Sequence, residues 1–228
     1  VTVLRNILRV DSRFMEKMRH AMFFALVNIL WLVGCIPIVS IGLSTTALYD
    51  CLLAYRRTKD PGEWKRFFRS IRRNWKQAVP AGILLELAGG LIALSIWSTG
   101  VTDLPAKLFF ISGAGVAAVL WVCAALYFFP LLAQFDNSGP ALLRTALVIG
   151  LCHFPSTLAL LTMWMGAFFL CSASWYLLPL WSFGGFALTA YLTVFIYRRV
   201  FVRYGATVDD AGGQCGEIHP KGAGVNNV

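Results

Sequence analysis

The sequence predicts an all-α protein, a polytopic transmembrane helical bundle of about six membrane segments with basic amphipathic helices at the membrane surface. Of its 228 residues, 58% are hydrophobic and only 14% are charged, and the mean hydropathy is +0.68. Such a composition is too apolar for one ordinary soluble domain. The apolar residues gather in runs that approach the roughly 20 residues a helix needs to cross a bilayer. Most of the 20 Lys and Arg residues lie between those runs.

The apolar runs follow one another along the chain with short connections. The first run ends at Pro37, and the second is short and polar at its start, with Ser44, Thr45 and Thr46. The fifth run is so long that we expect Pro155 to kink it or to separate an interfacial half from a spanning half. No internal repeat is visible. The runs comprise residues 21–36, 41–55, 78–97, 107–135, 141–170 and 179–197.

The chain is predicted to have three regions. Residues 1–20 form a basic amphipathic helix, residues 21–204 form the membrane domain with an interfacial helix at 60–76, and residues 205–228 form a disordered cytoplasmic tail. The tail is rich in glycine and asparagine and has few large apolar side chains, so it cannot bury enough surface to offset its ordering entropy. No cleaved secretory signal is expected, because the first apolar run continues into more membrane sequence.

The positions of the basic residues predict the orientation of the spans. Dense basic groups precede the run 21–36, separate the runs 41–55 and 78–97, and follow the run 179–197. With six spans and both termini in the cytoplasm, Lys107 is the one basic residue placed outside. Lys and Arg favour cytoplasmic loops, so we expect a multi-pass protein with both termini cytoplasmic.

The first twenty residues carry a regular basic pattern. Arg5, Arg9, Arg13 and Lys17 are spaced by four residues, so they share one face of a helix whose other side is apolar. We expect this helix to lie on the membrane with its basic face toward anionic lipid head groups. Contact with a partner protein is the alternative.

A second basic amphipathic helix is predicted to begin at Asp60-Pro61-Gly62-Glu63. Asp60 can cap it, Pro61 suits its first position, and Glu63 can complete a capping box. We interpret this helix as bound to anionic lipid at the inner surface, with a docking surface for a cytoplasmic partner as the alternative and nucleic acid not expected. Its apolar residues are Trp64, Phe67, Phe68, Ile71 and Trp75, and its basic residues are Lys65, Arg66, Arg69, Arg72, Arg73 and Lys76.

Three polar residues inside the apolar runs are candidates for substrate binding. Glu86 shares a helical face with small residues, so it is expected to point into the bundle, where it either handles substrate or protons or makes a structural hydrogen bond. Asp50 lies near the inner basic residues, which makes an interfacial ion pair the alternative to a function. His153 precedes Phe154-Pro155 and is expected to help satisfy kinked backbone, with ligand binding as the alternative.

Enzymatic activity is not expected, and neither is a cofactor or a metal. The three histidines are predicted at different levels of the chain, and the six cysteines show no metal-ligand spacing. The sequence also lacks a Walker A motif, a G-x-S-x-G nucleophile elbow and an H-E-x-x-H pair.

Several motifs resemble the YesL family of bacterial membrane proteins, a domain of unknown function (624). The most specific is Asn28-x-x-Trp31 followed by IPIVSIGLSTTALY at residues 36–49, with Ser40 where threonine would be expected. The similarity extends over roughly residues 28–204. Its further stretches are Phe67-Phe68, NWKQ at 74–77, FPLLAQFDN at 129–137, HFPSTL at 153–158 and RVF at 199–201.

The resemblance implies several membrane helices, a bacterial cytoplasmic membrane, and genes near those for carbohydrate uptake and glycoside hydrolysis. It supplies no catalytic residue. Our leading hypothesis is a non-enzymatic accessory or assembly component of carbohydrate uptake, with a carbohydrate ABC transporter complex as the candidate partner. The alternative is a small transporter that uses Glu86 and Asp50 in a polar cavity, with helices broken near Pro37 and Pro155.

Overall fold

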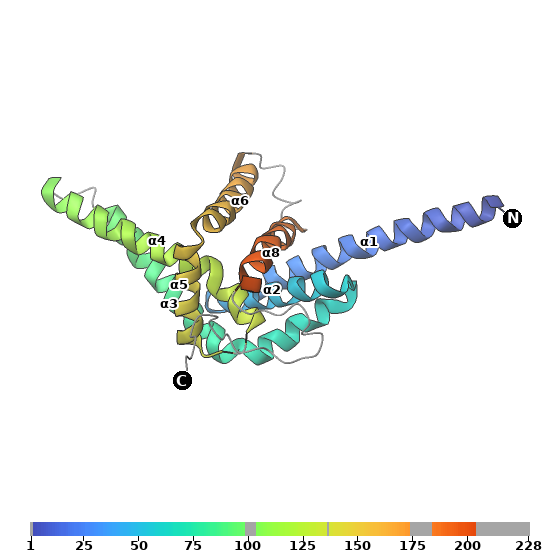
Figure 1. The fold of residues 1–228 in the computed structure, drawn as a ribbon, viewed down its shortest axis with the longest axis horizontal. Helices are drawn as coiled ribbons and strands as arrows, with labels where there is room; N and C mark the ends of the chain where they lie inside the picture. The colour runs from blue at the N-terminus through green and yellow to red at the C-terminus, as the bar shows by residue number, and fades with distance from the viewer. Residues whose placement is uncertain (1, 99–103, 136, 174–183, 204–228) are drawn as a thin grey trace, which may run out of the picture.

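The computed structural model describes residues 2–98, 104–135, 137–173 and 184–203, and within these ranges the chain is helical with no strand. Helix α2 lies at the centre, where the other helices converge (Figure 1). The elements in chain order are α1 (Thr2–Cys35), η1 (Ile38–Ser40), α2 (Ile41–Thr58), η2 (Pro61–Lys65), α3 (Arg66–Ser98), α4 (Leu104–Gln134), α5 (Gly139–Cys152), α6 (Phe154–Ala173) and α8 (Phe186–Arg203).

Helix α2 is the core of the bundle. All of residues 42–55 except Thr45 are buried, because α1, α3, α4 and α8 pack around the helix. Leu48, Leu52 and Cys51 have no exposed surface. Its buried residues include Ser44, Thr46 and Asp50, so the helix is enclosed on all sides although it is not apolar on all sides. The second apolar run is therefore the most enclosed part of the described chain, although it is also the shortest run in the sequence.

Helix α1 joins two regions that the sequence divides. The basic segment 1–20 and the first apolar run were expected as separate helices, but one helix continues from Thr2 to Cys35 (Figure 1). Residues 2–33 contain neither glycine nor proline, so nothing interrupts the hydrogen-bond ladder. The helix ends just before Pro37, where the proline ring disfavours helical backbone in the preceding residue.

Helix α3 likewise combines the predicted interfacial helix with the third apolar run. It continues through Pro80, which lies inside the helix. The expected cap forms in part: Asp60 Oδ1 accepts a hydrogen bond from the Gly62 amide at 2.9 Å, at the start of η2. The prediction of a capping box is wrong. The Asp60 amide donates to the Thr58 hydroxyl at 3.1 Å rather than to the Glu63 side chain, and Glu63 pairs with Arg66.

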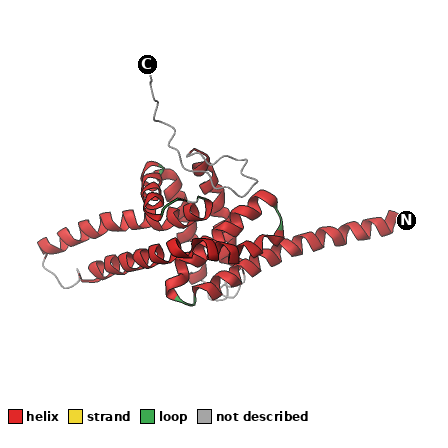
Figure 2. Ribbon diagram, turned by 90° about the horizontal axis from the view of Figure 1, so that it is seen from below, coloured by secondary structure: helices red, strands yellow, loops and turns green. Residues whose placement is uncertain are grey.

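Helices α3 and α4 form a hairpin whose outer half projects from the bundle (Figure 2). The Trp121 indole donates to the Leu85 carbonyl at 2.7 Å, and its ring covers Gly89. Beyond this contact the apolar side chains are exposed, including Leu91 at 68% and Trp97 at 83%. Such a surface suits a hydrocarbon environment.

The fifth apolar run is broken, as Pro155 predicts. Helix α5 ends at Cys152, α6 begins at Phe154, and the two are bent by 95°. The sixth run was expected at residues 179–197, but residues 179–183 lie outside the described part. Helix α8 begins at Phe186 and continues to Arg203.

The described chain has 4 helices that are long and apolar enough to cross a membrane, or up to 5 if α5 and α6 form one broken span. Helix α8 is not among them, since its 18 residues include three arginines. Six spans are therefore not established. The candidate spans are Phe14–Cys35, Ile38–Thr58, Pro61–Ser98 and Phe110–Gln134.

Candidate functional site

A buried carboxylate at the centre of the bundle is tied to the basic part of α3. Asp50, on α2, is 8% exposed. Its Oδ2 accepts a hydrogen bond from Arg73 Nη2 at 3.3 Å, and its Oδ1 lies 3.8 Å from Arg66 Nε. Ser70 Oγ accepts a hydrogen bond from the Asn74 side-chain amide at 3.2 Å. The ion pair that the sequence left as an alternative for Asp50 is therefore present.

The same arginine connects a third helix. Arg73 Nη2 also lies 3.4 Å from the Ala133 carbonyl oxygen, near the end of α4. The last carbonyls of a helix lack intrahelical donors, so a guanidinium there satisfies a backbone group and complements the helix dipole. Arg73 thus fixes α2, α3 and α4 relative to one another.

The first turns of α3 pack on the bundle with only part of the predicted apolar face, through Phe67. Phe67, Ser70, Asn74 and Ala78 are buried against the bundle. The predicted face included Phe68 and Trp75, which are 52% and 53% exposed; Trp64 and Ile71 are partly buried. Helix α3 is oriented about its own axis so that Arg66 and Arg73 reach Asp50. Satisfying that carboxylate and burying the Ser70–Asn74 hydrogen bond decide which side faces inward.

This rotation divides the six predicted basic residues into two groups. Arg66 and Arg73 turn toward Asp50. The other four are separated by steps of three or four residues, so they line one side, opposite the buried face; Lys65 ends η2 and the other three lie on α3. No ion pair to any of them occurs in the part of the chain that is described. We call these four residues the basic stripe: Lys65, Arg69, Arg72 and Lys76, all exposed.

The basic residues of α1 are only partly described. Arg5, Arg9 and Arg13 lie on this helix, but their side chains are outside the described part. Lys17 is exposed.

Glu86 lies on the side of α3 where other elements approach closely. A methyl group added at Gly42 of α2 would lie 3.0 Å from the Gly82 Cα, and one added at Gly89 would lie 2.8 Å from the Trp121 ring. Gly82 and Gly89 therefore admit neighbouring elements, as expected, whereas Gly90 faces open space. Glu86 Oε1 is buried and has no hydrogen-bond partner among the described residues.

Glu86 and Asp50 do not share a site. Asp50 lies eight residues from Gly42 along α2, and Glu86 lies four residues beyond Gly82 in the opposite direction along α3. Because Gly42 and Gly82 are in contact, the helical rise separates the two carboxylates by about 18 Å along the helix axes. Neither of the two grooves along α3 is lined by Glu86 or Asp50.

His153 lies at the break between α5 and α6, and its carbonyl accepts from the Ser156 and Thr157 amides. The sequence singled out His153 but missed Thr157. The buried Thr157 hydroxyl donates to the Gly150 carbonyl at 2.8 Å and accepts from Tyr127 at 3.1 Å. The Thr157 hydroxyl therefore provides a hydrogen-bond donor for a backbone carbonyl at the break between α5 and α6. A threonine two residues after a mid-run proline is the signal that could have found it.

A second group of cations, also missed in the sequence, joins α2 to α8. The Arg56 and Arg199 guanidiniums lie 4.4 Å and 4.8 Å from the centre of the Phe195 ring. Lys59 Nζ donates to the Tyr191 hydroxyl at 2.9 Å. The spacing by four of Tyr191, Phe195 and Arg199 was the available signal.

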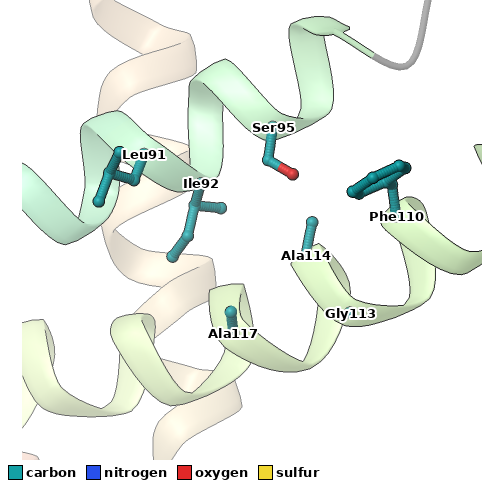
Figure 3. A pocket seen from close by; sticks show the side chains of 7 residues that line it. All are labelled: Leu91, Ile92, Ser95, Phe110, Gly113, Ala114 and Ala117. Atoms are coloured by element: carbon teal, nitrogen blue, oxygen red, sulfur yellow. The ribbon is translucent and has the colours of Figure 1, made fainter. Parts of the chain in front are cut away.

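Two grooves lie along α3. The outer groove, of about 300 Å³, is formed with α4, and Figure 3 shows Ile92 and Ser95 on one side of it and Ala114 and Ala117 on the other. The inner groove, of about 350 Å³, lies between α3, α4 and α5. It is lined mainly by apolar side chains, with Lys76 and Gln77 at one end.

Comparison with known families places the Asp50 ion pairs and the basic stripe in one recognised unit. Residues 24–96 match a family described as "Protein of unknown function, DUF624". We refer to this matched segment as the DUF624 domain. It comprises the second half of α1, all of α2 and nearly all of α3, and it confirms the resemblance over that range. The motifs after residue 96 lie outside the match.

The DUF624 match and the apolar helices together describe a multi-pass membrane protein of unknown function. No curated protein and no solved structure matches the chain. The DUF624 domain is built as three antiparallel segments: Tyr55 of α2 contacts Phe24 of α1, and Asp50 contacts Arg73 of α3.

Proposed function

We propose that this protein is a non-enzymatic accessory or assembly component of carbohydrate uptake in the bacterial cytoplasmic membrane, with both termini cytoplasmic. The carbohydrate association comes from the family resemblance. The observation that carries the accessory role is the basic stripe, four exposed cations on one side of a helix whose opposite side is buried. Because the opposite side of the helix is packed on the bundle, the cations are already ordered before a partner binds, which lowers the entropic cost of association.

The partner surface follows from the chemistry of the stripe. Cations that have no acidic partner within the described chain favour an acidic protein surface or anionic lipid, and complementary charge raises both association rate and specificity. Phe68 and Trp75 are exposed on the flank beside the stripe. The candidate partner is a carbohydrate ABC transporter complex, and α3 would meet it at the membrane surface.

A transporter that uses Glu86 and Asp50 has less support. Asp50 is compensated by Arg66 and Arg73, so it lacks the free carboxylate that cation or proton handling would need. Glu86 lies far from it along the helix axes and on the other side of the Gly42–Gly82 contact.

The proposal is tested by co-expressing the chain with the membrane and ATPase subunits of a carbohydrate importer from the same bacterium, followed by purification in mild detergent. The variant Lys65→Gln/Arg69→Gln/Arg72→Gln is expected to lose the importer subunits. The control Arg19→Gln/Arg144→Gln/Arg198→Gln removes equal charge at exposed positions elsewhere and is expected to retain them. Failure of the unaltered chain to bind any importer subunit, or equal loss with both triple variants, would refute the proposal.

A further inference from the structure

The inner groove combines an apolar channel with a cationic end. Ala81, Leu84 and Leu143 line its apolar part, and Lys76 and Gln77 lie at the other end. Its volume of about 350 Å³ falls in the range of pockets that hold small organic ligands. A ligand that matches both ends must itself be apolar over most of its length and anionic at one end.

The cationic end of the groove lies at the level expected for lipid head groups. Trp75 is exposed beside it, and Lys76 Nζ lies 5.9 Å from the centre of the Trp75 ring. Tryptophan and lysine favour the boundary between hydrocarbon and water. From this end the groove extends along α3 toward Leu84, in the direction of the exposed leucines of the projecting hairpin. The order of polar and apolar groups along the groove therefore matches that of a membrane lipid.

We propose that the inner groove binds one anionic glycerophospholipid, with an acyl chain along Ala81, Leu84 and Leu143 and the phosphate beside Lys76. The positive end of the α5 dipole adds to the attraction, since Gly139 and Pro140 at its N-terminus also line the groove. The groove shares Lys76 with the basic stripe, but Lys65, Arg69 and Arg72, which are changed in the importer test, do not line it, so the two proposals are tested at different residues.

The backbone of the groove indicates which anionic lipid fits best. Pro80 lies inside α3 and has no amide hydrogen, so it cannot donate to the carbonyl of Lys76. A head group with hydroxyl donors can satisfy that carbonyl while its phosphate contacts the Lys76 ammonium. Phosphatidylglycerol has both groups, whereas phosphatidylcholine has neither the net negative charge nor a hydroxyl donor.

The test is native mass spectrometry of the full chain after reconstitution into nanodiscs that contain equal amounts of phosphatidylglycerol and phosphatidylcholine. One phosphatidylglycerol is expected to remain bound in preference to phosphatidylcholine. Lys76→Gln should lower its retention about fivefold, the effect of one lysine near an anionic surface. Lys76→Arg should restore it, and Ala81→Phe, which fills the apolar part, should lower retention of both lipids.

The control for these variants is Arg69→Gln, which removes the same charge from the basic stripe outside the groove and should leave retention unchanged. Equal retention of the two lipids by the unaltered chain would overturn the proposal. So would an Arg69→Gln effect as large as that of Lys76→Gln, because it would show diffuse attraction to the whole surface. Should Ala81→Phe fail to fold, the exposed Lys76 variants still decide the result. Loss of the lipid leaves the importer experiment unaffected, so the two proposals fail separately.

Discussion

Asp50 Oδ2 and Arg73 Nη2, 3.3 Å apart, join the most buried helix of this protein to its most basic one. The pair lies within the DUF624 domain and extends through Arg73 to the Ala133 carbonyl of α4. It explains how the helix that the sequence predicts at the membrane surface is joined to the bundle.

The first prediction concerns this pair. Asp50→Leu leaves two guanidiniums without their shared carboxylate and should lower the free energy of unfolding by about 3 kcal/mol, the lower end of the range because the arginines are partly exposed. Arg73→Gln should also destabilise, whereas Arg72→Gln, on the exposed stripe, should change stability by less than about 0.5 kcal/mol. Unfolding by SDS in mixed micelles measures all three. Equal costs for Arg72→Gln and Arg73→Gln would contradict the assigned ion pair.

The second prediction tests the close approach of α2 and α3. In Gly42→Ala the added methyl group would lie 2.7 Å from the Phe129 ring and 3.0 Å from the Gly82 Cα, so one helix must shift. We expect a loss of about 1–3 kcal/mol, as for overpacked cores. Gly90→Ala is the control: nothing lies within 4 Å of its added methyl group, so the higher helix propensity of alanine should leave stability unchanged or improved. Thermal unfolding in detergent distinguishes the two, and a tolerated Gly42→Ala would disprove the contact.

A third prediction concerns the break between α5 and α6. Thr157→Val keeps the side-chain shape but leaves the Gly150 carbonyl without its donor and the Tyr127 hydroxyl without its acceptor. The expected loss is about 1–3 kcal/mol. Thr162→Val removes an exposed hydroxyl that bonds only to the carbonyl one turn earlier, and should be nearly neutral. If the two substitutions cost the same, Thr157 does not support the break.

A fourth prediction separates the roles of Glu86. Its Oε1 is buried and has no partner among the described residues, so replacing the carboxyl group should not cost a hydrogen bond at that atom. We expect Glu86→Gln and Glu86→Leu to fold with yields near that of the parent, as measured by size-exclusion chromatography in detergent. A folded Glu86→Leu variant that no longer supports carbohydrate uptake would make Glu86 functional. A strong loss of folded protein in Glu86→Leu alone would instead show a structural hydrogen bond.

The last prediction concerns orientation. Reporter fusions after Lys59, Asn137 and Tyr204 should report the cytoplasm, and fusions after Asp103 and Ser174 should report the outside, because this arrangement keeps nearly all basic residues inside. Arg56 and Arg199 both lie against the Phe195 ring, which agrees with a shared level for the ends of α2 and α8. An external signal at Lys59 would refute the model of both termini inside.

The sequence alone determined the helical class, the approximate positions of the helices and the break near Pro155. Long apolar runs of about the thickness of a bilayer have few alternatives to helix, since every backbone group in hydrocarbon needs an internal partner. Proline marks a break because it lacks the amide hydrogen and its ring clashes with the preceding turn. The motif around Asn28 and residues 36–49 was also sufficient to recognise the DUF624 domain.

The tertiary structure decided which side of each helix is buried. Periodicity placed Phe67, Phe68 and Trp75 on one apolar face of α3. In the structure Phe67 is buried against the bundle together with Ser70 and Asn74, whereas Phe68 and Trp75 are exposed. The hydrophobic pattern of one helix contains no information about a buried carboxylate on another helix. Because unpaired buried charge costs more than exposing two aromatic rings at a membrane surface, Asp50 determines how α3 is rotated.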